Sequence, residues 1–391
     1  MISEFDAIRP YEGAEVRAVV ARILGSDQLP AAVARVVMPK LLRDTDLGRL
    51  IATWMLRWRV GGLGEPGDVE AVVANYFARI VRESIVEFKV VGLDALERER
   101  ACLFISNHRD IVMDSGLLNY ALYRDGRDTA RLAVGNNLFD NPLASDLMRL
   151  NKSFIVRRDV SGPKALLRSL SLTSRYIRHS LDAGHSVWIA QREGRAKDGW
   201  DRSDPALLKM LGLAYRGDAQ PGDKQGIKQM LERHPIVPVS ISYELDPCAP
   251  AKARELARTA EQGVYTKEPD EDMHSMIRGV TGDKGRVNLT FGRPITNADG
   301  VDALAQRIDA EIVAGLEVFP THVKALTLQA PDAEVPSSAY DELKSVRSKF
   351  LRALRRVERL ERPYLLLQYA NVVHNKRELA ARSAEPSEET P

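Results

Sequence analysis

The sequence is poor in cysteine and carries almost no net charge. Only 2 of its 391 residues are cysteines, and Cys102 and Cys248 lie far apart with no histidine at ligand spacing beside them. This argues against a disulfide framework or a zinc site and favours a reducing compartment. The formal net charge is +2, so there is no bulk attraction to nucleic acid, and any affinity for anions must come from local clusters.

Long hydrophobic runs are also missing. No stretch of about 18 uncharged apolar residues occurs, so we expect no helix that spans a bilayer. The opening residues, MISEFDAIRPYEG, include acidic side chains and are followed by no apolar run, so we expect no secretory signal. These two absences predict a cytoplasmic protein.

What is present is typical of a globular protein with more than one structural unit. Hydrophobic residues make up 44% and charged residues 28%, and 391 residues are many for one core. Residues 1–85 have apolar side chains at helical spacing and are predicted to form a helical N-terminal domain. The helices predicted there are 12–24, 29–42, 46–60 and 68–85.

From residue 86, short β-rich runs alternate with helical segments. This pattern predicts an α/β domain over 86–330, with a mixed central sheet flanked by helices. The predicted strands are 85–92, 101–106, 130–135, 153–158, 185–190, 235–243 and 286–292; the predicted helices are 114–124, 141–150, 163–184 and 299–316. In such folds the chemistry lies in loops beyond the carboxyl ends of strands.

The remaining residues are predicted to form a helical C-terminal extension, 331–378, and a disordered acidic tail, 379–391. Within the extension, 338–363 places apolar residues on one helical face and arginines on the rest. The apolar residues are Val346, Phe350, Leu351, Leu354, Val357 and Leu360.

Candidate catalytic residues occur in SNHRDIVMD, residues 106–114, at the end of a predicted strand. The triplet His-Arg-Asp also occurs in protein kinases. A kinase needs Asn five residues after the Asp, but position 115 is Ser. No Gly-rich loop, Val-Ala-Ile-Lys strand or Asp-Phe-Gly motif is present either, so we reject a kinase.

A histidine beside a carboxylate can instead act as a general base. The imidazole takes a proton from a substrate hydroxyl, and the carboxylate orients the ring and stabilises its charged form. His108 at the mouth of a strand, with Asp114 in the following helix, fits this geometry. Four further blocks follow: KSFIVRRD (152–159), VWIAQREGRAKDG (187–199), PIVPVSISY (235–243) and LTFGRPI (289–295).

Over about residues 86–296, these blocks resemble the glycerolipid O-acyltransferase family, which includes glycerol-3-phosphate and 1-acylglycerol-3-phosphate acyltransferases. The resemblance implies that His108 is the catalytic base and Asp114 its partner. The family usually has four residues between His and Asp, whereas this chain has five. Either the loop carries one extra residue and Asp114 orients His108, which we favour, or Asp110 does so.

The resemblance also implies an acceptor-binding set at the ends of two other strands. It comprises Arg157, Arg158, Glu193, Gly194, Arg195 and Lys197. At least one of the two arginines at 157 and 158 is expected to contact phosphate, and guanidinium groups suit bidentate phosphate contacts. Gly194 lets the backbone turn sharply beside a ligand. QREG stands where many members have Phe-Pro-Glu-Gly, which leaves the local backbone shape open. Glu193 and Arg195 as a structural ion pair remains an alternative.

The resemblance predicts an enzyme that moves a fatty acyl group from acyl-CoA or acyl carrier protein to glycerol-3-phosphate or a lysophospholipid, in phospholipid biosynthesis. No metal or other cofactor is implied. The alternative is a non-catalytic lipid or acyl-thioester binding protein that retains the fold. A helix with Trp54 and Trp58 and the basic segment 344–362 both permit contact with a membrane surface. We therefore expect peripheral association with the inner face of the cytoplasmic membrane.

Overall fold

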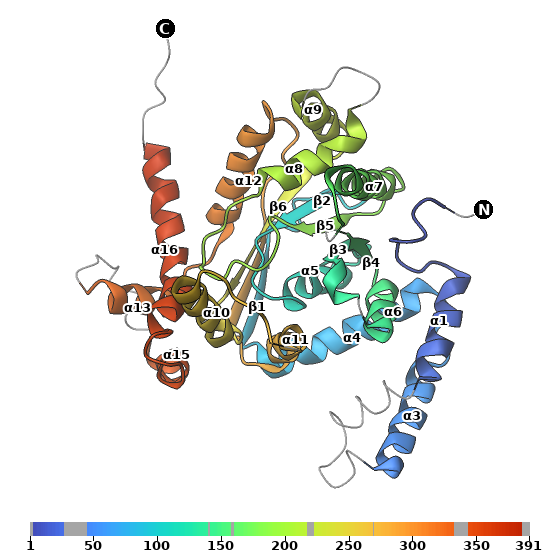
Figure 1. Cartoon of the computed structure of the whole chain (residues 1–391), viewed down its shortest axis with the longest axis horizontal. Coiled ribbons are helices and arrows are strands. Elements are labelled where there is room, and N and C mark those ends of the chain that lie inside the picture. The colour runs from blue at the N-terminus through green and yellow to red at the C-terminus, as the bar shows by residue number, and fades with distance from the viewer. Residues whose placement is uncertain are drawn as a thin grey trace. The chain divides into compact units, whose positions relative to one another are not determined.

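The computed structural model describes residues 3–26, 45–139, 141–157, 160–216, 223–268, 270–331 and 343–384 (Figure 1). The chain forms two compact units. The smaller comprises Met1–Phe77 and Thr129–Val187, and the larger comprises Ala78–Asp128 and Trp188–Pro391. Each unit combines two separate segments of the chain, whereas the predicted domains are continuous segments that end at 85, 330 and 378. The two divisions are not directly comparable, and those boundaries stay predictions.

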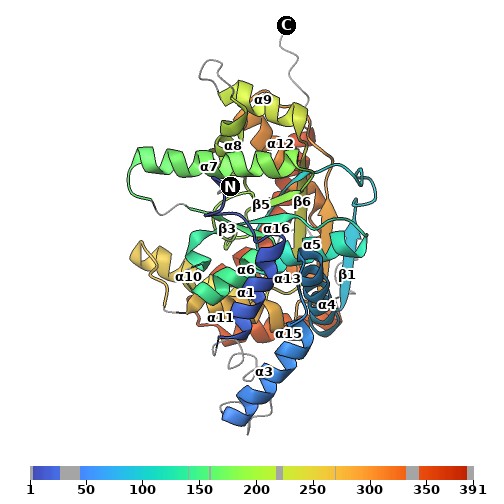
Figure 2. The ribbon, with the colours of Figure 1, turned by 90° about the vertical axis from the view of Figure 1, so that its right-hand side faces the viewer.

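The smaller unit contains most of the predicted N-terminal helices and a two-stranded parallel pair. Its elements are α1 (Ala14–Leu24), α3 (Asp46–Val60), most of α4 (Pro66–Ser84), β3 (Arg131–Gly135), α6 (Pro142–Leu150), β4 (Ser153–Val156) and α7 (Pro163–Asp182). Figures 1 and 2 both show α1 beside α6. The apolar face of α1, with Val16, Val20 and Ile23, forms a core with Val69 and Leu150. The predicted helix 29–42 lies outside the described residues.

The larger unit is built on a mixed sheet. Its strands are β1 (Glu87–Val91), β2 (Leu103–Ser106), β5 (Val187–Ala190, whose first residue is assigned to the smaller unit), β6 (Ile236–Tyr243) and β7 (Arg286–Phe291). They follow the order β1-β7-β6-β2-β5. β1 pairs with β7 and β2 with β6 in parallel, whereas β6 and β7 are antiparallel. The predicted mixed sheet flanked by helices is confirmed.

Burial explains which strands are central. All residues of β2 and β6 are buried, as their near-continuous runs of Leu, Ile, Val and Phe require. β1, by contrast, alternates between exposed and half-buried positions. The two central strands run in the same direction, so the residues that follow them emerge at one edge of the sheet.

Helices cover this sheet, several of them in places where the sequence pattern predicted none. The helices are α5 (Met113–Arg124), α8 (Pro205–Gly212), α9 (Asp223–Arg233), α10 (Ala249–Gln262), α11 (Glu271–Thr281), α12 (Val301–Gly315), α13 (Pro320–Gln329), α15 (Leu343–Arg356) and α16 (Arg362–Ala384). Figures 1 and 2 show α8 and α9 close to α12. Helices α8, α9, α10, α11 and α13 were not predicted.

The C-terminal helices pack on one another and on α10. Phe350 and Val357 are buried in a core with Leu365 and Ala370 of α16, and Leu351 and Leu354 pack against it. Leu360 does not join that face, because α15 ends at Arg356; its side chain is 73% exposed. Helix α16 continues to Ala384, so the segment expected to be disordered begins with helical residues; 385–391 lie outside the described residues.

Candidate active site

The carboxyl end of β2 is tied to β6 by a side chain. The Asn107 amide nitrogen donates to the Ile241 carbonyl at 3.0 Å, and its oxygen accepts from the Ile241 N–H at 2.8 Å. One residue earlier, the Ser106 hydroxyl accepts from the Trp188 indole N–H of β5 at 2.9 Å. Since both anchors are fully or almost fully buried, the next residue, His108, leaves the sheet from a fixed point.

His108 contacts Asp114 in the first turn of α5. Its Nδ1 lies 2.8 Å from Asp114 Oδ2, and the carboxylate side chain is 1% exposed. The same oxygen accepts the backbone N–H groups of Arg109 at 2.6 Å and Asp110 at 2.9 Å, and the other accepts the Tyr243 hydroxyl at 2.8 Å. The carboxylate is thus held from several directions with one edge against the imidazole.

Asp110 takes a different part in the same turn. Its Oδ1 accepts the backbone N–H groups of Val112 and Met113, both at 2.9 Å, and so caps the start of α5. This side-chain turn accommodates the extra residue between His108 and Asp114. Burial, and secondly the Asp114 charge, raise the pKa of Asp110 above its usual value. Of the two carboxylates, the structure therefore places Asp114 against the imidazole.

The contact fixes the chemistry that His108 can perform. A carboxylate only accepts hydrogen bonds, so in the neutral ring this contact favours the proton on Nδ1 and leaves the lone pair on Nε2. The side chain is 15% exposed, and the Trp188 ring lies edge-on to it with centroids 6.0 Å apart. Nε2 is therefore suited to remove a proton from a bound hydroxyl.

The Glu193-Gly194-Arg195 segment lies in the loop after β5, which joins the His108 loop directly. The Ala196 N–H donates to the His108 carbonyl at 2.7 Å. Gly194 has a φ of 71°, a conformation that favours glycine, and Glu193 is exposed. The Arg195 Nη1 is buried and has no hydrogen-bond partner within the described part of the chain.

Two other basic residues of this loop have acidic neighbours. Lys197 forms an ion pair with Glu255 of α10, and Arg192 lies 3.4 Å from Asp198. Lys197, predicted to bind substrate, is therefore already charge-neutralised. Among the described residues, Arg195 Nη1 and Arg192 Nε are buried guanidinium nitrogens of this loop without a hydrogen-bond partner.

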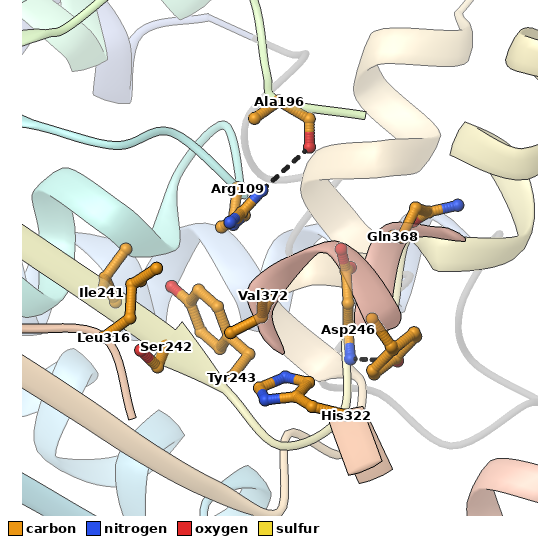
Figure 3. Close-up of a pocket in the computed structure, with 11 residues that line it drawn as sticks. Arg109, Ala196, Ile241, Ser242, Tyr243, Asp246, Leu316, His322, Gln368 and Val372 are labelled. Carbon is orange, nitrogen blue, oxygen red and sulfur yellow. Dashed lines mark hydrogen bonds between the residues drawn. The ribbon is translucent and has the colours of Figure 1, made fainter. Parts of the chain in front are cut away.

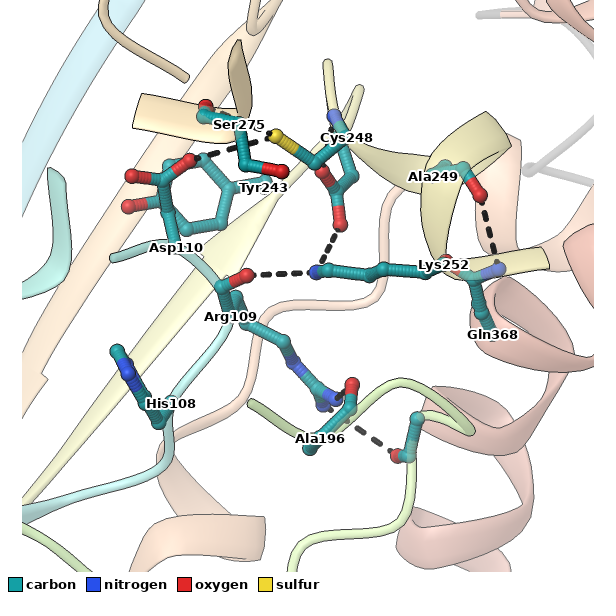
Figure 4. A network of polar contacts seen from close by, with 12 residues as sticks. His108, Arg109, Asp110, Ala196, Tyr243, Cys248, Ala249, Lys252, Ser275 and Gln368 are labelled. Atoms are coloured by element: carbon teal, nitrogen blue, oxygen red, sulfur yellow. Dashed lines mark hydrogen bonds and ion pairs between the residues drawn. The ribbon is translucent and has the colours of Figure 1, made fainter. Parts of the chain in front are cut away.

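Arg109 links the His108 loop to the loop after β5. Its guanidinium donates to the Ala196 and Gly199 carbonyls, both at 3.3 Å, and to Asp201 at 2.5 Å. Its own carbonyl accepts from Lys252 of α10 at 2.6 Å (Figure 4). Burial raises the pKa of Asp201 to about 6, while the Arg109 charge opposes the rise.

A small cavity lies against Arg109 and Tyr243. Its volume is about 30 Å³, and His322, Tyr369 and other side chains complete its lining (Figure 3). That is room for about two water molecules and too little for a lipid substrate. His322 accepts the Phe319 N–H, and burial lowers its pKa to about 3, so this histidine stays neutral. The cavity therefore lies among residues that hold the catalytic turn in place and is not the substrate-binding site.

The two arginines expected near phosphate follow β4 in the smaller unit. Arg157 is exposed and donates to the Ala7 carbonyl at 3.3 Å. Arg158 lies outside the described residues. Their role stays a prediction.

Sequence reasoning missed the residues that position the site. Tyr243 ends a predicted strand, and strands that run parallel to β2 place their carboxyl ends at its edge, so a polar residue there is a usable signal. Arg109 was considered only as part of a kinase triplet. Asp201, fully buried and paired with it, follows the recognised block by a few residues and shows no signal in the sequence.

Two absences hold for the described ranges alone. There, no group of three or more His, Cys, Asp and Glu side chains is arranged to hold a metal ion. Likewise, none of the helices in those ranges combines the length and hydrophobicity needed to cross a membrane.

Comparison with known proteins points to one family. Residues 87–242 match the family model described as Acyltransferase. A glycerol-3-phosphate acyltransferase of Pseudomonas syringae pv. tomato is 24% identical over 233 residues, 59% of this chain and 26% of the relative. Another, of Pseudoalteromonas atlantica, is 28% identical over 201 residues, 51% of this chain and 22% of the relative. The chain thus spans about a quarter of the length of these relatives.

One solved structure also aligns with most of the chain. The 1-acyl-sn-glycerophosphate (LPA) acyltransferase from Thermotoga maritima covers 82% of this chain and 97% of its own, at 13% sequence identity and a TM-score of 0.38.

Proposed function

We propose that this chain transfers a fatty acyl group from a thioester to the hydroxyl of glycerol-3-phosphate, because residues 87–242 match the Acyltransferase family model. The observation that carries the proposal is the contact between His108 and the buried Asp114 at the carboxyl end of β2. This pair is what deprotonation of an alcohol requires, and it sits where α/β folds carry their chemistry.

In the proposed reaction the acceptor hydroxyl is the nucleophile. His108 Nε2 takes the hydroxyl proton as the oxygen attacks the thioester carbonyl, and a carbon–oxygen bond forms. The tetrahedral intermediate collapses, the carbon–sulfur bond breaks, and the departing sulfur takes the proton from His108. Asp114 stabilises the imidazolium between these steps. The products are an ester and a free thiol, with no acyl-enzyme.

Glycerol-3-phosphate is the proposed acceptor for two reasons. The relatives cited above are named glycerol-3-phosphate acyltransferases. Arg195 also has a buried Nη1 without a partner among the described residues, and a phosphate oxygen would satisfy it. A lysophospholipid carries the same phosphate chemistry and is the competing acceptor.

The test follows labelled glycerol-3-phosphate into organic solvent. Purified protein is incubated with the labelled acceptor and either palmitoyl-CoA or palmitoyl-acyl carrier protein, which also decides the donor. We expect donor-dependent transfer of label into the organic phase. Lysophosphatidate is tried in parallel, with phosphatidate detected by mass spectrometry. No product from either acceptor with either donor would contradict the proposed function.

Arg195→Ala provides the matching binding test. Loss of one charged phosphate contact should raise KM for glycerol-3-phosphate about tenfold or more. Arg82→Ala, an exposed arginine of α4 in the same unit, is the control and should leave KM unchanged. Equal effects in the two variants would remove Arg195 from the acceptor site.

Peripheral contact with an anionic membrane is part of the proposal. Five exposed arginines lie on the last turns of α15 and just after it: Arg352, Arg355, Arg356, Arg359 and Arg362. Each basic residue near an anionic surface contributes about 1 kcal/mol, and the exposed Leu360 adds an apolar contact. Trp54 and Trp58 of α3, 67% and 76% exposed, are a further candidate contact.

Vesicle co-sedimentation tests this contact. We expect binding to phosphatidylglycerol vesicles, weaker binding at high salt, and loss of binding when Arg355, Arg356 and Arg359 are changed to Glu. Binding that is unaffected by these changes would contradict the assignment to α15.

A further inference from the structure

We propose that helix α16, more than a hundred residues beyond the matched family segment, is part of the acceptor site: Asn371 and Asn375 hold the loop that carries Arg195. The assignment of this loop to the acceptor site rests on the proposed function. The two hydrogen bonds from the asparagines to the loop, called the clamp below, are contacts within the larger unit. Both asparagines are positioning residues, since they bond protein backbone and not the reacting groups.

The clamp consists of two side-chain hydrogen bonds to successive carbonyls. The Asn371 amide nitrogen donates to the Asp198 carbonyl at 2.7 Å, and that of Asn375 donates to the Gly199 carbonyl at 2.9 Å. Both asparagine side chains are buried, 2% and 5% exposed as residues. Because these donors are shielded from water, loss of the Asn371 donor leaves the Asp198 carbonyl poorly satisfied. Loss of the Asn375 donor leaves the Gly199 carbonyl with the longer Arg109 contact at 3.3 Å.

The backbone at Gly199 requires this close approach. Its φ is 83°, and a Cβ there would lie 2.4 Å from the Gln368 carbonyl of α16. A side chain at this position would have to push the loop away from the helix. Loop and helix are therefore fitted to each other by shape as well as by hydrogen bonds.

The same loop is also bonded to the turn that carries His108. Arg109 donates to the Ala196 and Gly199 carbonyls, and the Ala196 N–H donates to the His108 carbonyl. Arg195 directly precedes Ala196, one of these attachment points, and lies three and four residues before the two carbonyls that α16 holds. A shift of the loop at Asp198 and Gly199 would accordingly move the guanidinium that the proposed function assigns to the acceptor phosphate.

Helix α16 can serve as a platform because it is itself firmly packed. Leu365 and Ala370 are fully buried in the core with α10, α13 and α15. Asn371 and Asn375 are four residues apart and so share one face. Asn is a poor helix former, and two buried ones in mid-helix indicate a tertiary role.

The test compares one double variant with one single control variant, and each new side chain has a shape similar to the one it replaces. Asn371→Leu and Asn375→Leu together remove the donors to the loop, while Gln368→Met removes a donor from the same helix that bonds only α10 and α16 itself. We expect the double variant to raise KM for glycerol-3-phosphate about tenfold, with kcat and the donor KM little changed. Hydrogen exchange of the 192–204 backbone should accelerate. Gln368→Met should change neither quantity.

The possible results distinguish failure of the clamp from failure of the proposed function. If wild-type protein acylates no acceptor, the proposed function fails, yet hydrogen exchange still tests the clamp. Unchanged exchange and unchanged acceptor KM in a folded double variant would overturn the inference. So would a Gln368→Met variant with the same exchange and KM changes, because the effect would then be general loosening of α16.

Discussion

Two aspartates four residues apart divide the work of the catalytic turn. Asp114 faces the imidazole and receives donors from two backbone amides and Tyr243, whereas Asp110 receives the first amides of α5. The distinction follows from the length of the turn: Asp110 comes too early to reach Nδ1 while it closes the turn, and Asp114 sits in the helix where both of its edges are occupied.

Substituting each aspartate should separate these roles. The Asn side chain in Asp114→Asn can donate as well as accept a hydrogen bond and carries no charge, so it neither fixes the proton on Nδ1 nor stabilises the imidazolium. We therefore expect kcat to fall by about a hundredfold or more. Asp110→Asn keeps an oxygen for the helix cap and should lower kcat by less than about fivefold. Steady-state kinetics of the two variants checks the order. A larger loss from Asp110→Asn would reverse the assignment.

At the residue scale, the sequence predicted the partner of His108 but not the partners of the other site residues. The favoured partner of His108 could be chosen because the helix pattern begins at Asp114, even with one residue too many in the loop. Lys197 could not be judged, since its neutralising partner, Glu255, is in a helix that the pattern did not predict. The roles of Tyr243 and Asp201 depend on three-dimensional neighbours that residue spacing does not contain.

Neighbouring helices pack against the turn that carries His108 and Asp110. Helix α11 contacts it at a glycine, Gly279. A Cβ at Gly279 would lie 2.1 Å from the Asp110 carboxylate, so this helix approaches the turn as closely as it does because it lacks a side chain there. The Cys248 thiol also faces Asp110, at 3.9 Å. The turn is therefore packed against α11 and the start of α10.

Gly279→Ala should reverse the usual effect of this change in a helix. Ala normally stabilises a helix interior by up to about 1 kcal/mol relative to Gly. Here the added carbon must displace a buried carboxylate, and we expect a loss of about 1–3 kcal/mol in unfolding free energy and a lower kcat. Gly67→Ala in α4, where a Cβ meets nothing within 4 Å, is the control. Urea unfolding that shows Gly279→Ala as stable as this control would contradict the packing argument.

Strands were more predictable from the sequence than helices. All seven strands of the described residues match predicted runs, because their Val- and Ile-rich segments are short and bounded by turns. Helix α10 escaped prediction because its buried face includes the small Ala249 and Ala253 and the charged Lys252, which give a weak apolar pattern. In α16 the buried Gln368, Asn371 and Asn375 interrupt the pattern where the helix touches the loop.

For the molecule as a whole, the cost of burying one cation sets a pH dependence of stability. Lys284 is fully buried and donates to the Ser84 hydroxyl and to the Val280 and Gly282 carbonyls. Burial lowers its pKa from 10.5 to about 8. Between these values the unfolded chain binds more protons than the folded protein, so this group makes stability rise with pH.

Lys284→Met removes that dependence. The difference in unfolding free energy, wild type minus variant, should increase by about 2 kcal/mol between about pH 7.5 and about pH 9.5. Denaturant unfolding at the two pH values checks this. A difference that stays constant would mean that the lysine binds its proton equally well in the folded and unfolded states, as it would if water reached it.

The whole chain also suits a direct assay of its chemistry. Both cysteines are buried, and burial raises the pKa of Cys102 to about 11 and that of Cys248 to about 12, so a thiol reagent should report the released donor thiol and not the protein. His108→Ala is the variant of choice, with its folding checked by circular dichroism.

Thiol release from palmitoyl-CoA or palmitoyl-acyl carrier protein, with and without glycerol-3-phosphate or lysophosphatidate, is therefore the most direct measurement. We predict release that depends on an acceptor in the wild type and is lost in His108→Ala. Undiminished release by a folded His108→Ala variant, or no acceptor-dependent release from the wild type with either donor, would contradict the account.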